Sequence, residues 1–113
     1  MKKVLVVENE KNLHNKWRNK LEGKVELVCA LFVEEAKEQF VANPDWAAIV
    51  VDADIGDEAI ALVKKFRETF TTGPMFAISN IGINKRALVC AGCNYEVGTK
   101  ESMPQKLLEV LGL

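Results

Sequence analysis

Side chains capable of chemistry follow four of the five short apolar segments in this chain. Acidic residues follow the first and third segments, a hydroxyl follows the fourth, and an amine comes soon after the fifth. In chain order the residues are Glu8, Asn9 and Glu10; Asp52, Asp54 and Asp57; Ser79 and Asn80; and Gly98, Thr99 and Lys100. If the segments are parallel strands, these residues share the edge of the sheet at which ligands bind. We therefore expect them to lie close together.

Such a group of residues indicates phosphoryl chemistry. Carboxylates that are brought together repel one another unless a cation holds them, and oxygen ligands with room for water suit Mg²⁺. A bound divalent ion could neutralise an incoming phosphoryl group while one carboxylate attacks phosphorus. A hydroxyl and an ammonium are natural partners for the new phosphate oxygens. The pattern predicts a phosphoacceptor site.

The elements that would position this site alternate along the chain. The apolar segments are residues 4–7, 25–29, 48–51, 75–78 and 95–97. They do not alternate cleanly between apolar and polar residues, which is typical of strands buried on both faces. Between them lie segments with helical periodicity, such as Leu13, Trp17 and Leu21. The alternation predicts an α/β fold of five βα units, with residues 1–113 forming one domain.

Local signals predict some helix ends and exclude other chemistry. Ser102 and Gln105 are spaced to cap the start of the last helix reciprocally, and Asp57 is expected to cap the third. Cys90 and Cys93 form a C-x-x-C pattern, but at the C-terminus of a predicted helix, where the dipole does not activate a thiol. We expect both cysteines to be packing residues. His14 is expected on the surface of the first helix.

The net charge argues against nucleic acid as a partner, and the short apolar runs argue against a membrane. Fifteen Lys and Arg oppose sixteen Asp and Glu, giving a net charge of −1 and no general field for a polyanion. The longest apolar run is far shorter than the ~18 residues that suggest a membrane span. The N-terminus lacks the layout of a signal peptide. We expect a cytoplasmic protein with reduced cysteines.

Four stretches in order, KKVLVVENE, IVVDADI, FAISN and AGCNYEV, resemble the receiver domain of two-component response regulators. The resemblance to these CheY-like domains extends over essentially the whole chain. It implies a flavodoxin-like (βα)5 sandwich with a parallel sheet of order 2-1-3-4-5. It also implies a protein that accepts phosphate from a histidine kinase or phosphotransfer protein. Output would pass to a downstream protein or to an output domain outside these residues.

The resemblance also assigns a role to individual residues. Asp52 would accept the phosphate and would assist its own phosphorylation and dephosphorylation. Mg²⁺ would be held by Glu8, Asn9, Asp52 and the backbone carbonyl of Asp54. Ser79 would be the switch hydroxyl, and Tyr95 would be the aromatic residue that changes rotamer on activation.

Two departures from the family pattern leave alternatives open. Asn9 replaces a carboxylate, and Gly98 stands where the family has its lysine, with Lys100 two residues later. Either the loop has a two-residue insertion and Lys100 is the switch cation, or the cation is missing. An alternative function is therefore a degenerate pseudo-receiver that binds a partner without being phosphorylated. A small flavin carrier on the same fold is a further alternative, although the acidic cluster would repel a flavin phosphate.

Overall fold

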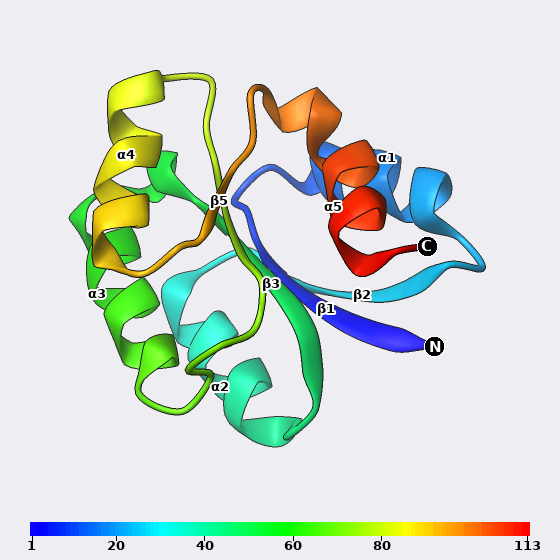
Figure 1. Ribbon diagram of the computed structural model, residues 1–113, viewed down its shortest axis with the longest axis horizontal. Helices are drawn as coiled ribbons and strands as arrows, with labels where there is room; N and C mark the ends of the chain where they lie inside the picture. Colours follow the sequence, from blue (N-terminus) through cyan, green and yellow to red (C-terminus); the bar gives the residue numbers. More distant parts are fainter.

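Five parallel strands form one sheet in the order β2-β1-β3-β4-β5, and helices cover both of its faces (Figure 1). The computed structural model describes residues 1–113. The strands are β1 (Lys2–Val7), β2 (Val25–Ala30), β3 (Trp46–Asp52), β4 (Met75–Ile78) and β5 (Tyr95–Glu96). The helices are α1 (Lys11–Leu21), α2 (Val33–Ala42), α3 (Asp57–Arg67), α4 (Gly82–Ala91) and α5 (Met103–Leu111), and none is long and apolar enough to cross a bilayer. The predicted fold class and strand order are confirmed.

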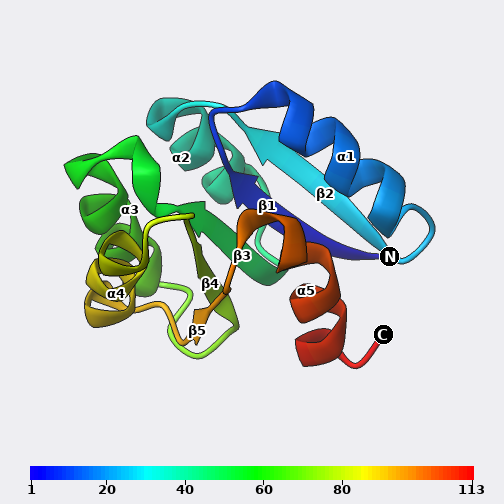
Figure 2. The ribbon, with the colours of Figure 1, turned by 90° about the horizontal axis from the view of Figure 1, so that it is seen from above.

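Successive residues of the central strands point to opposite faces of the sheet, and both faces are buried. In β3, Ile49 and Val51 belong to one apolar cluster, whereas Ala48 and Val50 belong to the other. Helices α2, α3 and α4 cover the first face, and α1 and α5 cover the second (Figures 1 and 2). This two-sided burial is the reason why the strands read as continuous apolar segments in the sequence.

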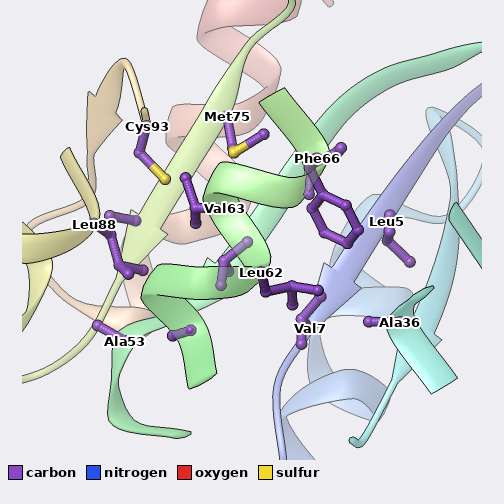
Figure 3. Packing of buried hydrophobic residues seen from close by; sticks show 14 of the residues in the cluster. Leu5, Val7, Ala36, Ala53, Leu62, Val63, Phe66, Met75, Leu88 and Cys93 are labelled. Carbon is purple, nitrogen blue, oxygen red and sulfur yellow. The ribbon is translucent and has the colours of Figure 1, made fainter. Parts of the chain in front are cut away.

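Helix α3 supplies the centre of the larger apolar cluster. Figure 3 shows Leu62 and Phe66 pointing from α3 toward the sheet, where Leu5 and Val7 of β1 lie. Phe66 also stacks on Phe40 of α2, with ring centroids 4.3 Å apart. Fully burying a side chain of this size stabilises the fold by about 1.5–3 kcal/mol. This packing anchors α3 to the strands whose carboxyl ends lead into the site loops.

The ends of two helices differ from the predictions. Thr99 and Ser102 cap each other reciprocally around a 3₁₀ turn (Lys100–Ser102), and α5 follows without a side-chain cap. The predicted pairing of Ser102 with Gln105 is wrong, because the Ser102 hydroxyl already bonds to Thr99. Asp57 is the first residue of α3 and makes no capping hydrogen bond, since Gly56 occupies the cap position.

The far end of α3 is tied to two loops by Arg67. Its Nε donates to the carbonyl of Gly92 at 2.8 Å, and one terminal nitrogen donates to the carbonyls of Phe70 and Gly73 at 2.8 and 2.9 Å. Gly92 ends α4 with a φ of 145°, and a Cβ there would lie 2.8 Å from Arg67 Cγ. The C-termini of α3 and α4 are thus held together by one guanidinium.

Candidate functional site

Three polar side chains converge at the carboxyl edge of the sheet. Glu8 directly follows β1, Asp52 is the last residue of β3, and Ser79 directly follows β4. Because β1, β3 and β4 are neighbours in the sheet, the three positions lie side by side. All three residues are completely buried. Such burial of two carboxyl groups requires compensation by hydrogen bonds or opposite charge.

Lys100 provides the opposite charge. It lies on the 3₁₀ turn before α5, and its Nζ is 2.9 Å from Glu8 Oε1 and 3.2 Å from Asp52 Oδ2. The same ammonium is 3.6 Å from Asp54 Oδ2. Burial alone would lower the pKa of Lys100, but the adjacent carboxylates outweigh burial and raise it. Of the two alternatives for this loop, the geometry matches the one in which the later lysine reaches the acidic cluster.

The environment of Asp52 holds its carboxyl in an unusual protonation range. Burial, with a smaller contribution from the charge of Glu8, raises its pKa from 3.8 to about 6. The amide of Asp54 donates to Asp52 Oδ1 at 2.8 Å, and Lys100 donates to Oδ2, which limits the rise. Asp52 is therefore largely an anion at neutral pH, with both oxygens directed by donors.

The hydroxyl of Ser79 bonds to Asp54 in this structure. It donates to Asp54 Oδ1 at 2.5 Å, and Asn84 Nδ2 of α4 donates to the same oxygen at 3.2 Å. Burial would raise the pKa of Asp54, but these hydrogen bonds and the charge of Lys100 together lower it. Sequence reasoning missed Asn84. Its place in the first turn of α4, five residues after the expected hydroxyl, was the available signal.

The residues expected to bind a metal ion are only partly brought together. Glu8 and Asp52 share the Lys100 ammonium, whereas Asn9 is exposed. No group of three or more acidic, histidine or cysteine side chains is arranged to hold a metal ion. The donors that are present are nevertheless oxygens, and the buried Glu8 Oε1 has the Lys100 ion pair but no hydrogen-bond partner. In chemical type these donors fit Mg²⁺.

Tyr95 lies apart from the charged cluster. It is half-buried on β5, and its ring stacks on Phe76 of β4 with centroids 5.0 Å apart. The Lys106 ammonium of α5 lies 5.9 Å from the centre of the same ring. The aromatic side chain therefore contacts β4 and α5, and its role as a switch stays a prediction.

His14 contacts the backbone of the site at Glu8. Its predicted surface position is wrong. It is buried in α1, and its Nε2 lies 2.6 Å from the carbonyl oxygen of Glu8. Burial lowers the pKa of His14, so the ring is neutral and Nε2–H donates. The spacing of His14 from Trp17 and Leu21, which face the core, could have revealed its burial.

The two cysteines of the C-x-x-C pattern differ from each other. Cys93 packs in the apolar cluster beside Leu88, and burial raises the pKa of its thiol to about 12 (Figure 3). Cys90 is exposed on α4, so its predicted packing role is wrong. Cys90 lies in the last turn of α4, whereas Cys93 follows Gly92, which ends the helix, and only Cys93 is buried.

Solved structures that match this fold over nearly the whole chain include response regulators. No protein-family model and no curated protein sequence matches the chain. A response regulator from Thermotoga maritima shares 18% identity and a TM-score of 0.83, covering 100% of this chain and 99% of that one. A two-component response regulator from Clostridium difficile shares 22% identity and a TM-score of 0.82, covering 99% and 97%.

A third structure carries ligands. A response regulator protein from Burkholderia pseudomallei, with a phosphorylated aspartic acid, a calcium ion and citrate, shares 16% identity and a TM-score of 0.83. The alignment covers 98% of this chain and 66% of that one. At these identities the likeness concerns the fold, which is that of response regulator receiver domains.

Proposed function

We propose that this chain is a phosphoacceptor receiver domain in which Asp52 accepts a phosphoryl group from a phosphohistidine on a histidine kinase or phosphotransfer protein. The observation that carries the proposal is the position of Asp52. It is a buried carboxylate at the end of the central strand, with the Lys100 ammonium 3.2 Å away. Because the burial of a carboxylate is costly, its presence at this position favours a chemical role over a packing role.

The proposed chemistry is nucleophilic attack on phosphorus. One oxygen of the Asp52 carboxylate forms the new O–P bond, the P–N bond to the donor imidazole breaks, and the imidazole leaves with the electron pair. Because the pKa of Asp52 is about 6, the nucleophile is ionised at neutral pH. The Asp52 side chain has no exposed surface, so its neighbours must move aside for a donor to approach.

Two side chains are placed to respond to the new phosphate. Lys100 already contacts Asp52 and can keep one hydrogen bond to a phosphate oxygen. Ser79 donates to Asp54 before phosphorylation, so a phosphate oxygen would compete for the same hydroxyl proton. An exchange of partners by Ser79 would release one of the hydrogen bonds that hold Asp54.

Mg²⁺ belongs to this proposal as a cofactor. Glu8, Asn9, Asp52 and the backbone carbonyl of Asp54 would hold it, and it would supply positive charge to the transferring phosphoryl group. The output would be a changed protein-binding surface formed by α4, β5 and α5. Tyr95, between β4 and α5, would change rotamer there.

Mass spectrometry of the intact protein tests the proposal. The chain is incubated with acetyl phosphate and Mg²⁺, and we expect the parent to gain one phosphoryl group while Asp52→Asn gains none. Asp45→Asn, at an exposed aspartate between α2 and β3, is the matched control and should behave like the parent. Uptake should fall as the pH drops through about 6, where Asp52 becomes protonated. Equal uptake by the parent and Asp52→Asn would refute the assignment.

A phosphorylation-independent interaction module is the second candidate. It is favoured by the exposed Asn9 and by the closed ion pairs of Glu8 and Asp52 with Lys100. This pseudo-receiver predicts that beryllofluoride with Mg²⁺ leaves the NMR spectrum unchanged. The phosphoacceptor predicts shifts centred on Ser79 and the loop of Lys100.

A further inference from the structure

A second lysine is buried near the site, on helix α4. Lys85 is only 7% exposed, although lysine is among the residues least often buried. Its Nζ donates to the carbonyl oxygen of Val97 at 2.8 Å and to that of Gly98 at 2.9 Å. It forms no salt bridge. The ammonium is therefore held by two neutral backbone acceptors alone.

Both hydrogen-bond acceptors of the Lys85 ammonium lie in the loop after β5. A lysine on a surface helix can extend its charged end into water at almost no cost, so an ammonium turned inward needs strong partners. Hydrogen bonds from a charged donor are about twice as strong as neutral ones. The consecutive carbonyls of Val97 and Gly98 are these partners, so the Lys85 ammonium restrains the position of this stretch of backbone.

The backbone held by Lys85 leads directly to Lys100. At the start of this loop, the amide of Val97 donates to the carbonyl of Ala77 in β4 at 3.0 Å. The amide of Lys100 donates to Asn80 Oδ1 at 3.3 Å. Between these two bonds, Lys85 holds the carbonyls of Val97 and Gly98. No other side chain donates to either of these carbonyls.

The loop that Lys85 restrains carries Lys100, the cation of the site. Strand β5 ends at Glu96, and the loop that follows it through Gly98 must bring the Lys100 ammonium to within 3.2 Å of Asp52. Gly98 is exposed, and a Cβ there would meet nothing within 4 Å, so packing does not restrain it. The hydrogen bonds from Lys85 restrain the loop instead.

We propose that Lys85 is a positioning residue, which fixes the Val97–Gly98 backbone so that the Lys100 ammonium reaches Asp52 and Glu8. Its importance for signalling rests on the proposed function. Because Lys85 belongs to α4, the restraint joins this helix to the loop of Lys100. A shift of α4 would therefore change the contact of Lys100 with Asp52.

The first test follows the Lys100 ammonium directly. In protein labelled with ¹⁵N on lysine side chains, the buried and ion-paired Lys100 ammonium should exchange its protons slowly with water. Lys85→Met keeps the apolar stem but removes the donors, and it should accelerate that exchange by about tenfold. Arg86→Met, at the neighbouring exposed position of α4, is the matched control and should leave the exchange unchanged. Unchanged exchange in folded Lys85→Met overturns the proposal.

The second test separates positioning from general destabilisation. Lys85→Met should slow phosphorylation by acetyl phosphate, but it should have no further effect once Lys100→Met is present. Equal slowing in both backgrounds overturns the proposal, because Lys85 would then act independently of Lys100. If the parent is not phosphorylated at all, the proposed function fails, whereas the exchange measurement still decides the role of Lys85. Should Lys85→Met not fold, Lys85→Leu replaces it, because leucine also lacks a donor, with the same expected acceleration and the same refuting outcome.

Discussion

Replacing Asp52 by asparagine should remove a pH-dependent cost from the stability of the protein. Burial raises the pKa of Asp52 in the folded protein to about 6, whereas the ordinary value is 3.8. The folded state therefore binds this proton more tightly than the unfolded state does. The resulting stabilisation is complete below pH 3.8 and is lost as the pH rises through about 6.

The two values set the size of the effect. A difference of about 2 pKa units corresponds to about 3 kcal/mol, since each unit is worth 1.36 kcal/mol. About 1 kcal/mol of this is already lost at about pH 4.5, so about 2 kcal/mol should be lost between about pH 4.5 and about pH 7.5. Asp52→Asn cannot titrate at this position. The stability of the variant relative to the parent should therefore rise by about 2 kcal/mol across this range.

Urea denaturation at a series of pH values measures the effect. The asparagine also changes a hydrogen bond with Lys100, but that contribution is nearly independent of pH and cancels when the two ends of the range are compared. Asp45→Asn, which removes an exposed carboxylate, should follow the profile of the parent. If the difference between Asp52→Asn and the parent stays constant with pH, the inference that burial governs Asp52 is refuted.

Two further predictions concern the side of the sheet covered by α3 and α4. Arg67→Ala should lower the free energy of unfolding by about 2–4 kcal/mol in urea denaturation, because three carbonyls lose a charged donor; an unchanged midpoint would show that they find other partners. With an aromatic disulfide reagent near pH 8, exposed Cys90 should react at once, whereas buried Cys93, with a pKa of about 12, should react only as the protein opens. Equal rates for both thiols in the native protein would contradict this packing.

The fold was predictable because its requirements are repetitive. Each strand needs apolar residues on both faces and each helix needs one apolar stripe, and both patterns are visible in the sequence. The ends of elements depend on backbone partners instead. Strand β3 starts at Trp46, two residues before the predicted segment 48–51, because Trp46 pairs with Lys3 of β1. Ser102 bonds to Thr99 rather than Gln105 for a similar reason, since a 3₁₀ turn intervenes before α5.

The site was predictable where it lies on strand ends and less so where it depends on loops. Glu8, Asp52 and Ser79 follow directly from the positions of their strands. The reach of Lys100 depends on the path of a loop, and the contribution of Asn84 depends on the orientation of α4. His14 was misplaced because polarity suggested the surface, whereas the ring is buried by its bond to the carbonyl of Glu8.

The opposite orientations of neighbouring residues in β3 restrict how such a chain can diverge. One residue inserted among Ala48, Ile49 and Val50 would turn every later side chain of β3 to the wrong face of the sheet, disrupting both apolar clusters at once. A connection such as the one before Lys100 can lengthen at only a small entropic cost. Within the strands, exchange among apolar residues of similar volume is tolerated. This explains how chains can keep a TM-score of 0.82–0.83 at only 16–22% identity.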